Sequence, residues 1–300
     1  MLDGFFLLSY FFNVLNKERE EIIFQTELKI DREYINLAEN LRSIASGERG
    51  LADPGLYRCA IEIASFRRGQ IESMGSDLTP KRALAGLRLV LIEVSSLNSQ
   101  VTYLSFSDEE REEKIATALG ILKTAEERFF PYLGFEDQFR TIDGSPFIWR
   151  AEILRYRAMT KERLPAVTLS DLETARKDYL AALSFSEYVA GDSDFKKDVR
   201  EAARMAAGII KIGILENTLK SARIRGGSID NKDLEETLFS SLTNLADAWK
   251  NGCCDQDRYL FGLNQIIKIL SEEGREDLTP LKAAAEEKRR LLLDKIHLSG

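Results

Sequence analysis

The sequence predicts an all-α fold. Apolar residues recur at intervals of three and four, rather than two, along nearly the whole chain, and this is the period of a helix face. Short segments rich in Gly, Asp, Ser and Pro separate the periodic runs, and these residues commonly begin and end helices. Because short connections make neighbouring helices antiparallel, we expect about ten helices stacked as antiparallel hairpins, in a superhelix or an irregular bundle.

The first two expected helices are defined by their apolar positions. A long helix is expected from about residue 13 to the segment SGERG, residues 46–50, which ends it. The second is expected over residues 54–69, beginning with a proline at its first turn. Along one of its faces, apolar residues are spaced by three, four and three: Leu56, Cys59, Ile63 and Phe66.

Capping residues predict the start of the next two helices. Thr79 followed by Pro80 is a favourable N-cap and first helical residue, which predicts a third helix to about Tyr103. Ser107 is the expected N-cap of a fourth helix, and the acids of residues 108–113 favour the positive end of its dipole.

Six further helices complete the expected fold. Gly, Pro, Ser and Asp residues delimit them. Their expected ranges are about 146–163, 170–189, 194–225, 231–250, 255–273 and 279–296. We expect residues 1–300 to form a single all-helical domain. An alternative division has a helical bundle at 1–133 and helical hairpins at 145–300, joined by an aromatic-rich loop at 131–147.

A repeat-like pattern occurs within residues 146–190. Its small and aromatic positions are Trp149, Tyr156, Ala175, Tyr179 and Ala182. This segment resembles a tetratricopeptide (TPR) repeat, in which small residues let two helices approach closely and an aromatic ring fills the groove. The connection around Pro165 is longer than in that family, and the family's period of about 34 residues does not recur along the chain. The resemblance implies a degenerate TPR-like superhelix that binds proteins or peptides.

Composition and charge exclude some partners and places. The net charge is -7 and no long basic run occurs, which argues against nucleic-acid binding. Hydrophobic residues make up 44% of the chain and charged residues 30%, as in soluble globular proteins. The chain's cysteines, Cys59, Cys253 and Cys254, are too few for a disulfide framework and favour a reducing compartment. The expected location is therefore cytoplasmic.

Motifs of catalysis and cofactor binding are absent from the sequence. The chain's one histidine, His297, is the fourth residue from the end of the sequence, where the rigid support that a catalytic or metal-binding imidazole needs is not expected. No CxxC pair and no phosphate-binding glycine loop occurs. We therefore expect a non-enzymatic protein with no catalytic residues, no cofactor and no metal.

Aromatic residues gather in the stretch ERFFPYLGFEDQFRTIDGSPFIW. The helical period breaks there, and a connection of this length usually has a function. Two interpretations stay open: a hydrophobic plug that seals the fold, or a binding surface for a protein or peptide partner. The candidate binding residues are Phe129, Tyr132, Phe135, Phe139, Arg140, Phe147, Trp149, Arg150 and Tyr156. An alternative function is binding of a small molecule or lipid in an apolar cavity under this loop.

The segment GFFLLSYFFNVL, residues 4–15, is the most apolar run in the chain. As a helix it would span about 18 Å, which is short of the roughly 30 Å of bilayer hydrocarbon. Acidic and mixed charges flank it, unlike the flanks of a signal peptide. Three interpretations stay open: a helix packed on the protein, a segment that docks on a membrane or a partner, and a truncated anchor. The second would permit a homo-oligomer or membrane association.

Overall fold

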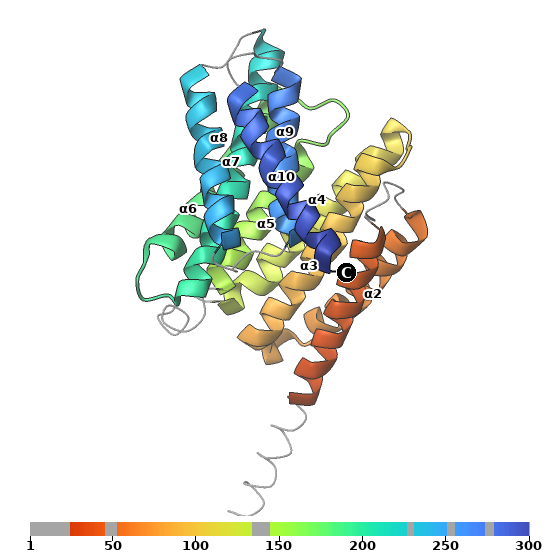
Figure 1. The fold of residues 1–300 in the computed structure, drawn as a ribbon. Coiled ribbons are helices and arrows are strands. Elements are labelled where there is room, and N and C mark those ends of the chain that lie inside the picture. Colours follow the sequence, from red (N-terminus) through yellow and green to blue (C-terminus); the bar gives the residue numbers. More distant parts are fainter. Residues whose placement is uncertain are drawn as a thin grey trace, which may run out of the picture. The chain divides into compact units, whose positions relative to one another are not determined.

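The computed structural model describes residues 25–45, 53–133, 145–226, 231–250, 256–273 and 279–299 (Figure 1). These residues form ten α-helices, a short 3₁₀ helix (Gly75–Asp77) and, within the described ranges, no strand, so the all-α prediction is confirmed. The α-helices are residues 25–45, α2 (Pro54–Glu72), α3 (Pro80–Tyr103), α4 (Asp108–Leu133), α5 (Ser145–Lys161), α6 (Leu169–Gly191), α7 (Lys197–Arg225), α8 (Asn231–Lys250), α9 (Gln256–Glu273) and α10 (Thr279–Ser299). Most begin and end within a few residues of the predicted ranges, and the expected start of the first helix lies outside the described residues.

Side-chain caps start the helices where the sequence places them. The Thr79 hydroxyl accepts a hydrogen bond from the Arg82 amide (3.4 Å), with Pro80 in the first turn of α3. Ser107 and Glu110 exchange hydrogen bonds at the start of α4 in the manner of a capping box. These local signals account for the accurate prediction of where the two helices begin.

The chain divides into two compact units. The first contains Met1–Leu104 and Ala125–Leu133, and the second contains Ser105–Thr124 and Gly134–Gly300. In the first unit, α3 is buried around most of its circumference. The Phe129 ring packs directly on Gly86 of α3, where an added Cβ would lie 2.5 Å from the ring. Glycine at this position therefore lets a fully buried phenylalanine lie against the helix backbone.

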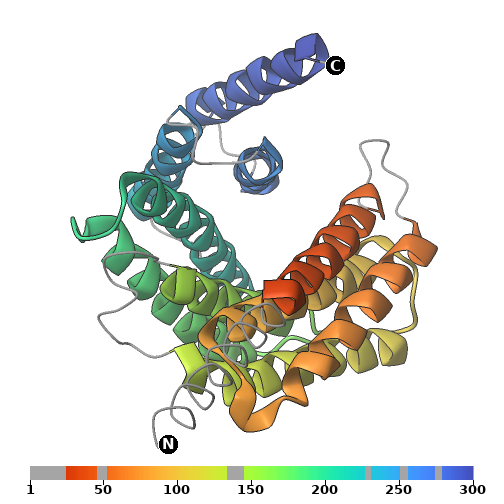
Figure 2. The same ribbon diagram turned by 90° about the horizontal axis from the view of Figure 1, so that it is seen from below.

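In the second unit, consecutive helices pack on one another from α5 to α8, and α9 packs most extensively on α10. Figure 2 shows this order as the colours pass from green to blue. Where α5, α6 and α7 meet, small residues surround one aromatic ring. This buried cluster consists of Ala151, Leu154, Ala158, Ala175, Tyr179, Ala182 and Ile210.

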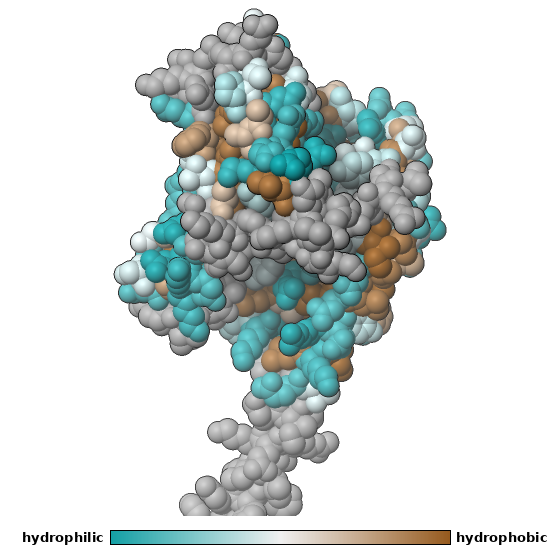
Figure 3. All heavy atoms as spheres, viewed as in Figure 1, coloured by the Kyte–Doolittle hydropathy of each residue, from teal (hydrophilic) through white to brown (hydrophobic). Residues whose placement is uncertain are grey.

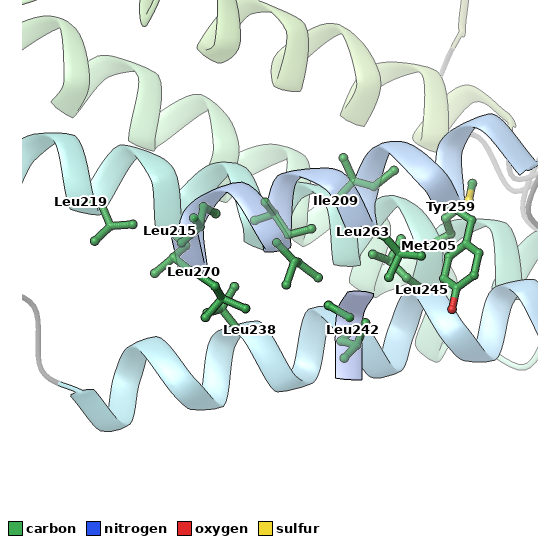
Figure 4. Packing of buried hydrophobic residues seen from close by; sticks show 14 residues of the cluster. Met205, Ile209, Leu215, Leu219, Leu238, Leu242, Leu245, Tyr259, Leu263 and Leu270 are labelled. Carbon is green, nitrogen blue, oxygen red and sulfur yellow. The ribbon is translucent and has the colours of Figure 1, made fainter. Parts of the chain in front are cut away.

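A larger apolar cluster holds α7, α8 and α9 together (Figure 4). Leu238, Leu242 and Leu245 of α8 face Leu263 of α9 and the apolar side of α7, and Ala285 adds α10 to the cluster. Leu245 also lies against Gly262 of α9, where an added Cβ would be 2.5 Å from its methyl carbon. Close helix packing at small residues therefore occurs in both parts of this unit.

Candidate partner-binding surfaces

Helix 25–45 and α2 form an antiparallel hairpin in the first unit. The Asp53 amide donates to the Ala45 carbonyl (3.3 Å) at the connected end. Farther along, the Arg67 side chain donates to Asp31 (2.7 Å), and the rings of Tyr34 and Phe66 lie 6.1 Å apart. These three contacts fix the register of the two helices.

A buried arginine of α2 joins the two helices of the hairpin through hydrogen bonds and ion pairs. Arg67, 6% exposed, donates to Asp31 and also to Glu27 (2.8 Å) and Gln70 (2.7 Å). Its guanidinium lies 5.7 Å from the centre of the Tyr34 ring. Burial raises the pKa of Asp31, and the hydrogen bond and charge of Arg67 oppose that rise. Because such a charge is costly to bury without its partner, the pair fixes how the two helices meet.

The buried side of α2 is not the face that Leu56, Cys59, Ile63 and Phe66 occupy. The structure buries the neighbouring face, which consists of Tyr57, Ala60, Ala64, Arg67 and Ile71. The two alanines have no side chain beyond Cβ, and they therefore allow close packing of neighbouring helices. Leu56 and Ile63 are half-buried, whereas Cys59 and Phe66 are exposed.

A second apolar row follows the outer side of helix 25–45 at spacings of four and three. We call the two rows together the hairpin face; its residues are Ile30, Tyr34, Leu37, Leu41, Ile44, Leu56, Cys59, Ile63 and Phe66. The exposed fractions of Ile30, Leu37, Ile44 and Phe66 are 36%, 51%, 63% and 57%. Apolar side chains come to the surface over the red and orange helices in the space-filling view (Figure 3). The spacing is that of a coiled-coil seam, which normally lies against another helix.

The third helix of this unit, α3, lies on the other side of the hairpin. Arg68 of α2 donates two hydrogen bonds to Glu93 of α3, at 2.8 and 3.3 Å. Arg88 of α3 pairs with Glu39 of helix 25–45 at 3.6 Å. Burial raises the pKa of Glu93, and Arg68 opposes this rise. The hairpin thus packs on α3 with one side and directs the hairpin face away from it.

The residues predicted to bind a partner occupy varied positions. Phe129 is fully buried, and the Tyr132 hydroxyl donates to the Gly75 carbonyl (2.9 Å); both belong to the first unit. Phe135, Phe139 and Arg140 lie outside the described residues, as do all residues from 134 to 144 of the loop predicted at 131–147. In the second unit, Phe147 and Arg150 are buried, and Trp149 and Tyr156 are half-buried. The binding loop and the cavity beneath it therefore stay predictions.

Phe147 takes part in an aromatic cluster where α5 begins and α6 ends. Its ring lies edge-on to Tyr188 (5.4 Å) and to Phe195 (6.0 Å), and Tyr188 and Phe195 are 5.9 Å apart. Tyr188 keeps 42% of its surface exposed. Such edge-to-face contacts stabilise the junction of α5, α6 and the chain before α7.

Charged groups inside the second unit are paired across α5, α6 and α7. Asp178 of α6 accepts hydrogen bonds from Arg157 (2.9 Å) and Lys161 (2.8 Å) of α5. Glu162, just after α5, accepts from Asn217 (2.7 Å) and Lys220 (2.8 Å) of α7. Because each carboxylate accepts hydrogen bonds from donors on a neighbouring helix, each is suited to positioning helices.

Metal-binding side chains and membrane-spanning helices bear on the predictions that exclude other functions. No group of three or more His, Cys, Asp or Glu side chains converges as a metal site among the described residues. Cys253 and Cys254 lie outside the description, and so does the side chain of His297. Among the residues that the structure describes, every helix is too short or too polar to cross a membrane. The predictions of no enzyme activity and no cofactor stay predictions.

Comparison of the chain with protein-family models, with curated proteins and with solved structures gave no match. The relation to TPR proteins therefore stays a prediction from the sequence.

Proposed function

We propose that this protein is a non-enzymatic, TPR-like helical scaffold that binds a helical segment of a partner protein on the hairpin face. The observation that carries the proposal is the pair of apolar rows, at helical spacing, on the solvent side of two antiparallel helices. An amphipathic helix binds such a surface by laying its own apolar side between the two rows. The small-residue packing of α5, α6 and α7 also supports a helical-repeat scaffold.

The exposed area of the hairpin face indicates a moderate affinity for a partner helix. Ile30, Leu37, Ile44 and Phe66 together expose an area equivalent to about two whole apolar side chains. Burying these would contribute about 3–6 kcal/mol, and the partner's apolar side would contribute a similar amount. Association costs about 4–15 kcal/mol in lost freedom, so a complex formed by this face alone is a reversible one.

The test is native mass spectrometry of the protein purified from its own host, with two matched variants. Phe66→Glu places a charge on the hairpin face, and Phe239→Glu places one on α8, where the phenylalanine is 63% exposed. We expect a polypeptide of one defined mass to stay with the unchanged protein and with Phe239→Glu, and to be lost from Phe66→Glu. Equal retention by the two variants, with both folded by circular dichroism, would overturn the proposal. A doubled mass would identify a second copy as the partner.

A further inference from the structure

We propose that residues 4–15 of the same chain cover the hairpin face when no partner is bound. The inference rests on the proposed function only in one respect, namely that a partner would displace this segment. An apolar surface of this kind is an association liability in water, and so is the apolar run itself. Covering one with the other removes both surfaces from water.

Chain length and direction allow this arrangement. Residues 4–15 precede helix 25–45 on the chain, and helix 25–45 carries one row of the hairpin face. This arrangement requires residues 16–24 to be a connection, in contrast to the expectation from periodicity that the first helix begins at about residue 13. Extended, these nine residues reach up to about 30 Å, enough to reverse the chain. Twelve helical residues would be about 18 Å long, and the row from Ile30 to Ile44 is about 21 Å long. The segment thus fits the length of the surface.

The residue spacing is complementary as well. Within the segment, Phe5, Leu8, Phe12 and Leu15 are spaced by three, four and three. This is the spacing of both rows of the hairpin face, so a helical segment would place its large side chains between theirs. Residues 4–15 contain no charged side chain, so none would be buried there.

Tethering favours this segment over a second copy of the chain. A segment on a short linker has an effective concentration of about 1 mM at its own protein's surface. A second copy at micromolar concentration is about a thousandfold more dilute. The segment of the same chain therefore outcompetes that of a second copy for the same surface, unless the linker prevents it from reaching.

Cys59 is a native reporter for the cover, because it belongs to the hairpin face and carries a free thiol. The reaction of Cys59 with a thiol reagent is measured in full-length protein in which Cys253 and Cys254 are replaced by serine. We expect Leu8→Asp with Phe12→Asp to raise the rate by at least about tenfold, since opening of the cover then costs less. Leu2→Asp, outside the segment, is the control and should leave the rate unchanged. Equal rates in all three proteins would overturn the proposal.

Disulfide formation identifies which molecule supplies the cover. In the same background, a cysteine is placed in turn at residues 5, 8, 12 and 15, and the protein is oxidised gently. A disulfide with Cys59 within one chain, at one or two neighbouring positions, is the expected result. A disulfide-linked dimer would assign the cover to a second copy, and no disulfide at any position would leave the face uncovered; both would overturn the proposal.

Both measurements use purified protein without a partner, so their failure leaves the proposed function standing. Flotation with phosphatidylcholine vesicles tests whether residues 4–15 bind a membrane instead of the hairpin face. Flotation that depends on residues 4–15, together with loss of the disulfide within one chain, would assign this segment to a lipid surface and overturn the proposal.

Discussion

Replacing Gly213 by alanine tests the close packing of α6 on α7. A Cβ added at Gly213 would lie 2.7 Å from the Tyr179 ring and 3.1 Å from its hydroxyl. Tyr179 is 2% exposed and belongs to the buried cluster with Leu154 and Ile210, so the ring has little room to move. Overpacking of this kind costs about 1–3 kcal/mol. Alanine also gains up to about 1 kcal/mol over glycine within a helix. The expected net loss of unfolding free energy is therefore about 1 kcal/mol.

The matched control is Gly120→Ala in α4, where an added Cβ has no neighbour within 4 Å. This variant should gain about 0.5–1 kcal/mol from helix propensity alone. Urea denaturation followed by circular dichroism measures both variants, and the expected difference between them is about 2 kcal/mol. If Gly213→Ala stabilised the protein as much as Gly120→Ala, the described contact between α6 and α7 would be wrong.

Two further predictions concern buried charge and helix capping. Arg67→Met should lower the free energy of unfolding by about 3–5 kcal/mol, because it leaves the Asp31 carboxylate buried without its cation, and adding Asp31→Asn should restore much of that loss. Thr168→Ala should cost about 1 kcal/mol, since Thr168 and Asp171 form the capping box of α6. Hydrogen bonds from Thr168 lower the pKa of Asp171 below its ordinary 3.8, so its stabilising contribution is present above that pH and is lost as the pH falls through the lowered value. The stability difference between the protein and Asp171→Asn should accordingly shrink in acid, and an unchanged difference at low pH would contradict this.

Local signals in the sequence predicted the helices well. Threonine or serine caps, followed by proline or acidic residues, correctly placed the starts of α3 and α4. These signals act within one turn of a helix, so they do not depend on the rest of the fold. The expected helix over 54–69 was three residues too short, because Gly69 was taken as its end, whereas α2 continues to Glu72.

The choice of buried face on α2 could not be made from periodicity alone. Two rows on this helix have the spacing of a helix face, and the one with the larger apolar residues is the more exposed. Packing favours the row with Ala60 and Ala64, because neighbouring helices approach closely there. The presence of Arg67 in that row made it look polar, and only the partner Asp31, 36 residues away, explains its burial.

The sequence predicted only part of the candidate site, again because a pattern of residues does not show which of them the fold buries. Aromatic enrichment directed attention to Phe129 and Phe147, but large rings at helix ends fill cores as readily as they form surfaces. The sequence did contain a signal for the hairpin face, because helix 25–45 carries two apolar rows and only one of them is needed to pack on the rest of the unit. The row that includes Ile35 and Ala38 is buried, and the row from Ile30 to Ile44 belongs to the hairpin face and is largely exposed. Recognising the second row requires knowing which one the fold buries.

The most direct test of the binding role is a photo-crosslinking residue placed at Leu37 of the hairpin face, compared with one at Leu180 of α6. The two side chains are similarly exposed, at 51% and 48%. We predict that residue 37, in cells, crosslinks to one defined helical segment, in a partner protein or within residues 4–15, and that residue 180 does not. No crosslink from residue 37, or the same products from both positions, would contradict the assignment of the hairpin face as a binding surface.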